Sequence, residues 1–138
     1  MSAIFPASTT QGGVCFGFPD VCKTPAPPGP PVPLPYPNFG MLNQASKAST
    51  KVKFAGKPAI TIRSEIPRSS GDEAGTAGGV ISNRNMDKVT FKSGSTKVKV
   101  EGQPCVHLTS TTSHNGINAN APQGLVITPS QTKVIISP

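Results

Sequence analysis

The sequence contains no tryptophan, one tyrosine and six phenylalanines, so aromatic residues make up only 5% of its 138 residues. A chain of this length has room for one domain, and with so few large side chains its hydrophobic core must be thin. No apolar run approaches the roughly 20 residues that a membrane-spanning helix requires. We therefore expect residues 1–138 to form a single small domain without a transmembrane helix.

A secretory signal is also missing, because the first 22 residues contain no Lys or Arg and no continuous apolar stretch. We therefore expect the chain to start in the cytoplasm. Only three cysteines are present, and in that compartment buried thiols or metal ligands are more common than disulfides.

Helix-forming patterns are scarce, since the chain has 14 glycines and 16 prolines and shows no sustained 3.6-residue periodicity. Short segments in which polar and apolar residues alternate predict half-buried strands instead, as at Lys51–Phe54 and Lys97–Val100. The expected fold is all-β, with further strands at Ala59–Ile62, Lys88–Lys92, Cys105–Thr109, Leu125–Thr128 and Thr132–Ile136.

Acidic residues are few, with six acids against 13 bases and a net charge of +7. The bases are spread singly along the expected strands, which is typical of a solvated face and favours no nucleic-acid partner. Asp72 and Glu73 are neighbours in a loop and do not form a positioned acid–base pair. A pair of Cys22 with His114 has no recognisable oxyanion donors, so we expect no enzyme.

Prolines concentrate in the N-terminal segment 1–46, where residues 25–37 contain eight prolines in thirteen positions. Such a run is extended and lacks backbone donors for a sheet. It is typical of a ligand for an SH3-type domain, of a rigid spacer, or of a strap over the protein's own surface. The apolar residues Val32, Leu34 and Tyr36 at every second position favour an N-terminal strap with these side chains turned inward.

The strongest pattern is an internal repeat within residues 47–138. Residues 49–64 and 95–110 are identical at eight of sixteen positions, and each copy predicts a β-hairpin with a Gly-centred turn. Residues 130–137 form a partial third copy. Because one hairpin cannot bury its apolar face alone, we expect a small conical prism of hairpins with pseudo-threefold symmetry. An ordinary duplicated β-sandwich is the alternative.

Metal binding is a further possibility that the residues leave open. Cys105 and His107 share one face of a predicted strand, and a set of two cysteines and two histidines satisfies tetrahedral zinc. A thin core also benefits from a metal staple. The alternative is that the cysteines are small buried hydrophobes and the histidines polar surface residues.

Four motifs together resemble the PAAR-like family, which is related to the proline-alanine-alanine-arginine repeat proteins that tip contractile injection machines. They are FPDVCKTPAPPGPPVPLPYPN (18–38), GDEAGTAGGV (71–80), SGSTKVKVEGQP (93–104) and TTSHN (111–115). The resemblance implies a β-rich cone that caps the trimeric, valine-glycine-repeat spike of a type VI secretion system and sharpens it for membrane piercing. It also implies delivery on the spike without a signal peptide.

The same resemblance implies a structural zinc near the point, with Cys22 and His114 as the first ligands. Cys105 and His107 complete the expected ligand set because they share one face of a predicted strand. Cys15 is the alternative ligand. Because the chain ends at Pro138 without a fused toxin, we expect a bare tip that contacts the target membrane mechanically, with any effector riding as a separate chain. A Pro-rich binding module and a small metal- or Cys-dependent enzyme are the alternatives.

Overall fold

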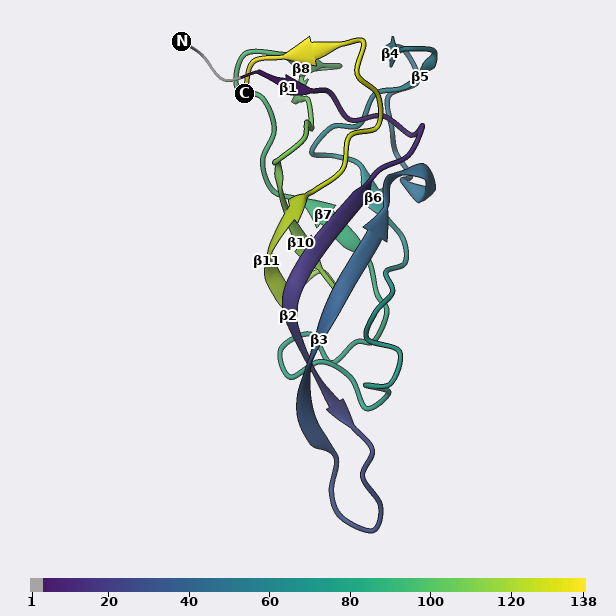
Figure 1. The fold of residues 1–138 in the computed structure, drawn as a ribbon, viewed down its shortest axis with the longest axis vertical. Coiled ribbons are helices and arrows are strands. Elements are labelled where there is room, and N and C mark those ends of the chain that lie inside the picture. Colours follow the sequence, from purple (N-terminus) through teal and green to yellow (C-terminus); the bar gives the residue numbers. More distant parts are fainter. Residues whose placement is uncertain (1–3) are drawn as a thin grey trace.

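The computed structural model describes residues 4–138, so the first three residues of segment 1–46 lie outside it. The protein tapers from a wide end, where the first described residues and the C-terminus lie, to a narrow end formed by one long hairpin (Figure 1). Between residues 4 and 138 there is no α-helix, which confirms the expected all-β class. The elements are β1 (Phe5–Pro6), β2 (Val14–Thr24), β3 (Val32–Met41), the 3-10 turn η1 (Leu42–Gln44), β4 (Lys53–Phe54), β5 (Lys57–Pro58), β6 (Glu65–Ile66), β7 (Val89–Phe91), β8 (Lys99–Val100), β9 (Gln103–Pro104), β10 (Thr111–His114), β11 (Ala121–Val126) and β12 (Ile135–Ile136).

One antiparallel sheet of six strands, in the order β3-β2-β11-β10-β7-β6, connects the two ends. Its apolar face packs on a hydrophobic core under the wide end. The fully buried aliphatic members of this core are small or medium in size: Leu42, Ile60, Ile66, Val89, Val106 and Val126. No helix of residues 4–138 is long and apolar enough to cross a membrane.

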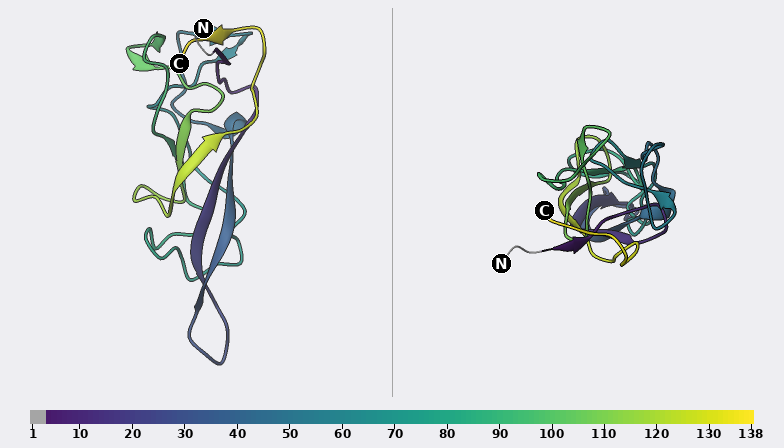
Figure 2. Two further views of the ribbon diagram at one scale, coloured as in Figure 1. Left: turned by 60° about the vertical axis from the view of Figure 1, so that its left-hand side comes forward. Right: turned by 90° about the horizontal axis from the view of Figure 1, so that it is seen from above.

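The proline-rich segment is extended, as expected, but it is a sheet strand and not a surface strap. Residues 32–41 pair with β2 from Thr24↔Val32 to Val14↔Met41. The expected inward packing is wrong for Val32 and Leu34, which are 43% and 41% exposed, whereas Tyr36 is half-buried. Residues 25–31 form the loop that makes the narrow end (Figure 2).

The position of the prolines explains how this strand forms. In an antiparallel pair, successive N–H groups point alternately toward the partner strand and away from it. β3 is the edge strand, and its prolines occupy positions 33, 35 and 37, all of one parity. Phe39, of the same parity, donates its N–H outward to the Ser70 carbonyl at 2.7 Å. The prolines therefore replace only N–H groups that point away from β2.

The internal repeat forms two equivalent hairpins, β4–β5 and β8–β9, as predicted. Their turns have left-handed backbone at both central residues, with φ of 53° and 83° at Ala55 and Gly56 and of 50° and 81° at Glu101 and Gly102. Two positive φ values define the tight turn that suits a two-residue hairpin. These hairpins confirm the Gly-centred turns expected from the sequence.

The third copy is closed by the two ends of the chain. β12 pairs with β1 through Ile135↔Pro6, just as β4 and β5 pair through Lys53↔Pro58. Gln131 Oε1 accepts the Val134 N–H at 2.7 Å. In the other two copies Ser49 and Ser95 accept the N–H groups of the matching valines, Val52 and Val98. The partial third repeat is thus completed by N-terminal residues that carry no visible repeat signal.

A ring of three hydrogen bonds joins the copies. Ser8 donates its backbone N–H to Val106 O at 2.8 Å, Val106 donates to Ile60 O at 2.9 Å, and Ile60 donates back to Ser8 O at 3.1 Å. The apolar cluster of the wide end follows the same symmetry, and its nine members are three triads: Ala7, Ala59 and Cys105; Phe54, Val100 and Ile136; Val52, Val98 and Val134. Seen from above, the chain encircles this axis (Figure 2).

Candidate functional site

A buried polar cluster occupies the narrow half of the protein, with Asp20 at its centre. Asp20 follows an irregularity in β2, between Gly17 and Asp20, and is fully buried. Its carboxylate accepts N–H groups from three asparagine side chains: Asn38 at 3.1 Å, Asn115 at 3.1 Å, and Asn120. Hydrogen bonds to the charged form offset the cost of burying a carboxylate.

The amide groups around Asp20 have defined orientations, because each amide oxygen has its own donor. Asn115 Oδ1 accepts the Asp87 N–H at 3.0 Å, and Asn120 Oδ1 accepts the Ile81 N–H at 2.8 Å. Both NH₂ groups must therefore face Asp20. The cluster joins β2 to loops about a hundred residues away in sequence. It therefore holds these loops against β2 in the narrow half of the protein.

Cys22 and Asp72 complete the cluster. Cys22 lies two residues after Asp20, and its Sγ is 3.4 Å from Asp20 Oδ1 and 3.7 Å from Asp72 Oδ2. Asp72 is fully buried, and its Oδ1 has no hydrogen-bond partner. One ligand atom from each of the three residues lies within 4.8 Å of the others. Asp20, Cys22 and Asp72 form a buried group that could hold a metal ion.

Protonation in this group reflects burial and crowding of negative charge. Burial raises the pKa of Asp72 to about 7, with a further contribution from hydrogen bonding and charge at Asp20. Burial also raises the pKa of the Cys22 thiol, and again the Asp20 charge adds to the effect. A cation that binds here must displace the thiol proton and the Asp72 proton.

His114 lies next to this cluster and is fully occupied by protein partners. Its Nδ1 is 2.7 Å from Asn38 Oδ1, and its Nε2 is 2.8 Å from the Thr112 hydroxyl. Burial lowers its pKa to about 4, so the ring is neutral at neutral pH. Since Asn38 offers only an oxygen here, Nδ1 carries the proton. His114 therefore orients Asn38 toward Asp20.

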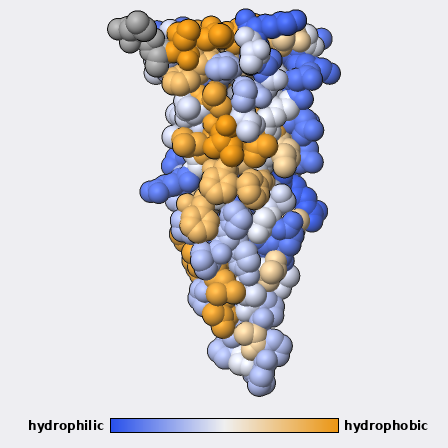
Figure 3. All heavy atoms as spheres, viewed as in Figure 1, coloured by the Kyte–Doolittle hydropathy of each residue, from blue (hydrophilic) through white to orange (hydrophobic). Residues whose placement is uncertain are grey.

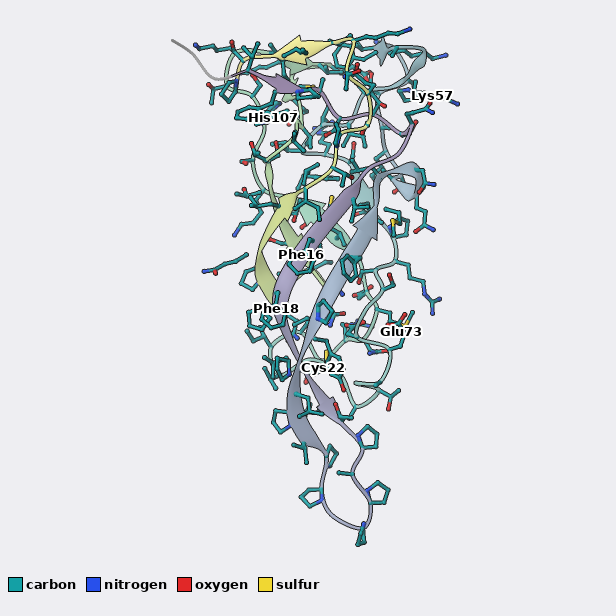
Figure 4. All side chains as sticks on the ribbon, viewed as in Figure 1. Phe16, Phe18, Cys22, Lys57, Glu73 and His107 are labelled. Carbon is teal, nitrogen blue, oxygen red and sulfur yellow. The ribbon has the colours of Figure 1, made fainter. Side chains whose placement is uncertain are left out.

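The four residues expected to ligate one zinc do not come together. Cys22 belongs to the cluster of the narrow half and His114 lies beside it, whereas Cys105 and His107 lie at the wide end (Figure 4). Cys105 occupies the apolar position that Ala7 and Ala59 fill in the other copies. This corrects the expectation, drawn from its position on a predicted strand, that Cys105 joins Cys22 and His114 at one zinc.

His107 and the alternative ligand Cys15 also have other surroundings than expected. The His107 ring stacks on Phe5 with centroids 5.3 Å apart, and its Nδ1 is 2.6 Å from the Leu108 carbonyl oxygen. Cys15 belongs to the central apolar core, where burial raises the pKa of its thiol.

Sequence reasoning did not select Asp20 and Asp72. Asp20 could have been found, because it lies two residues before Cys22 and shares its face in an extended strand. Asp72 carries no such signal, since its loop reaches Cys22 only through the fold. Glu73, its neighbour, is exposed (Figure 4).

Comparison with known proteins decides the family. Residues 13–121 match the family model described as the toxin PAAR-like domain. This chain belongs to the PAAR-like family. The resemblance drawn from its motifs is thereby confirmed.

One curated relative of this PAAR-like chain is a protein named DNase toxin Tse7 from Pseudomonas aeruginosa. It is 38% identical over 104 residues, which cover 71% of this chain and 27% of the relative. The chain thus spans about a quarter of the length of that relative. No solved structure matches the chain.

Proposed function

We propose that this PAAR-like chain is the tip of a type VI secretion spike or of a related contractile injection particle. Its wide end seats on a trimeric spike protein, and its narrow end leads into the target membrane. The observation that carries the proposal is the hydrogen-bond ring of Ser8, Ile60 and Val106. Through this ring a single chain presents three equivalent edges, which suits a partner with threefold symmetry.

The architecture of the narrow half supports a mechanical role. Asp20, Cys22 and Asp72 are fully buried, so no substrate reaches them without unfolding. The amide groups that converge on Asp20 tie the leading hairpin to the loops around it. Such a network favours rigidity, which a penetrating tip requires.

The family and the relative both support a role of this tip in carrying a toxic effector protein. The family description names a toxin domain, and the relative is named a DNase toxin. Because the match covers 27% of that relative, we take the matched part as the delivery part and not as the nuclease. The toxin would travel with the tip, on the same polypeptide or as a separate chain. The tip would be made in the cytoplasm and leave on the spike without a signal peptide.

Co-purification with the trimeric spike protein of the same bacterium tests the docking. We expect a complex of one tip chain with one spike trimer by light scattering. A variant that lacks the loop 25–31 should bind equally well, because that loop lies at the opposite end (Figure 1). Absence of binding by the native chain, or its loss in the loop variant, would contradict docking through the wide end.

We also propose that Asp20, Cys22 and Asp72 hold zinc. Thiolate and carboxylate are both established zinc ligands, and the unpartnered Asp72 Oδ1 offers a free lone pair inside the protein. A bound cation would neutralise two adjacent carboxylates and add its binding energy to folding. This set replaces the expected one, retaining only Cys22.

Elemental analysis of purified protein tests the zinc site. Cys22→Ser and Asp72→Asn should reduce zinc content and lower the melting temperature of the zinc-loaded protein. Cys105→Ser is the matched control, because Cys105 is also buried but lies in the apolar cluster of the wide end. Equal zinc content in all three variants, or none in the native protein, would rule out this site.

A further inference from the structure

Three lysines occupy the same backbone position in the three copies at the wide end. Lys51 and Lys97 donate their N–H groups to Ser49 Oγ at 3.2 Å and Ser95 Oγ at 3.1 Å. Lys133 donates to Gln131 Oε1 at 2.7 Å. All three side chains are exposed. We call Lys51, Lys97 and Lys133 the lysine triad.

The lysine triad borders an apolar centre with the same symmetry. Val52, Val98 and Val134 follow the lysines directly and are only partly buried against the cluster of the wide end. An apolar centre within a polar rim is the usual anatomy of a protein–protein interface. A lipid surface or a nucleic acid would not require this threefold arrangement.

Charge around the triad has one dominant sign. The first two hairpins add Lys53, Lys57 and Lys99, all exposed, and Lys57 projects from the wide end (Figure 4). Glu101 is the one acid within residues 49–58, 95–104 and 131–136. In Figure 3 hydrophilic side chains gather on the right-hand part of the wide end, beside apolar side chains on its left.

The geometry points to a partner whose end face carries carboxylates repeated three times around its axis, each contacting one lysine of the triad. This inference rests on the proposed function and specifies the chemistry of the trimeric partner. The valines supply apolar contact, and the lysines fix rotation about the axis and exclude partners with basic end faces. On the third edge Ile135 stands where the first two have Lys53 and Lys99. The triad position is therefore the one of these two that is basic on all three edges.

Binding of charge variants to the spike trimer tests the inference. The triple variant Lys51→Glu, Lys97→Glu and Lys133→Glu should weaken binding by about tenfold or more, and native binding should weaken as salt rises. The control variant Arg68→Glu, Arg84→Glu and Lys92→Glu makes the same charge change at exposed sites outside the three hairpins. It should bind like the native chain.

A second triple variant, with Gln at the three triad positions, keeps the test decisive if the Glu variant folds poorly. It should show a smaller loss of binding together with a reduced salt dependence. Native-like binding by a folded triad variant would overturn the lysine contact and leave the proposed function standing. Failure of the native chain to bind a spike trimer would overturn both. A triad variant that lost binding only to anionic vesicles or DNA would also contradict the inference.

Discussion

Asn38 and His114 are joined by a buried hydrogen bond of 2.7 Å between Asn38 Oδ1 and His114 Nδ1, across 76 positions of sequence. Replacing the ring by an apolar group in His114→Leu would leave the Asn38 oxygen and the Thr112 hydroxyl without partners. Buried polar atoms without partners cost about 1–3 kcal/mol each. We therefore expect a loss of about 2–4 kcal/mol in the free energy of unfolding, measured with urea. His114→Gln should restore part of it, and equal losses in both variants would contradict this role.

The pH dependence of stability in metal-free protein should reflect two opposing groups. Burial lowers the pKa of His114 from 6.5 to about 4, so stability is lost as pH falls below 6.5, because the unfolded chain takes up the proton first. Burial and Asp20 raise the pKa of Asp72 from 3.8 to about 7. The stabilisation that Asp72 contributes is therefore complete below pH 3.8 and is lost as the pH rises through 7. Between roughly pH 4 and 6.5 the two slopes oppose each other.

Single variants separate these slopes. Asp72→Asn removes the titration of Asp72 and leaves that of His114. The free energy of unfolding of this variant should therefore rise from pH 4 to 6.5 by up to about 1.4 kcal/mol per pH unit. His114→Gln leaves Asp72 alone, and its stability should fall as pH rises over the same range. Urea unfolding at several pH values, with chelator present, measures both slopes. Parallel curves for the two variants would contradict the assignment.

Close packing against the His114 ring makes Gly124 essential for the sheet. A Cβ at Gly124 would lie nearest to Thr112 Oγ1 and 2.6 Å from His114 Cδ2, closer than real Cβ contacts come. Gly124→Ala should therefore destabilise the protein by about 1–3 kcal/mol. Gly29→Ala is the control, because the nearest atom, Ala26 O, is 3.5 Å from the added Cβ. Thermal unfolding that ranks the two variants equally would contradict the contact.

The repeated hairpins could be predicted from the sequence because their information is local. Alternating residues and a Gly-centred turn lie within sixteen positions, so the turns at Gly56 and Gly102 need no distant partner. The third copy was only partly visible, since β1 supplies its second strand from the other end of the chain. Pseudo-threefold symmetry could thus be expected, but not the closure by both termini.

The candidate site was harder to predict, because its residues meet only through the fold. Asp72 and Asn120 come from separate loops that reach β2 at Cys22 and at the Val21 carbonyl. Cys105 was misplaced by strand parity, since sharing a face with His107 does not determine which core that face covers. The prediction of a surface strap was wrong for residues 32–37, because a proline run excludes a central strand but not an edge strand.

The prolines of β3 should protect the leading hairpin from self-association. Pro33 and Pro35 lack the N–H groups that would face solvent at this sheet edge, and an edge without donors is a poor template for another strand. The double variant Pro33→Val and Pro35→Val restores those donors next to the exposed Val32 and Leu34. It should self-associate as concentration rises, as measured by light scattering.

The control for this prediction is Pro67→Val, which makes the same exchange at an exposed loop position. It should remain at the native oligomeric state over the same concentration range. If the double variant also stays at that state, the prolines serve only to stiffen the hairpin.

The two repeat turns should be open to stabilisation in equal measure. Ala55 and Glu101 have φ of 53° and 50°, a region that costs most residues energy but that Asn tolerates well. Ala55→Asn and Glu101→Asn create the Asn-Gly pair preferred in such turns, and each should raise the free energy of unfolding by about 0.5–1 kcal/mol. Ala77→Asn, at an exposed position without positive φ, should bring no gain. Because the hairpins are separate copies, the two gains should add in the double variant, and a gain confined to one turn would show that the copies are not energetically equivalent.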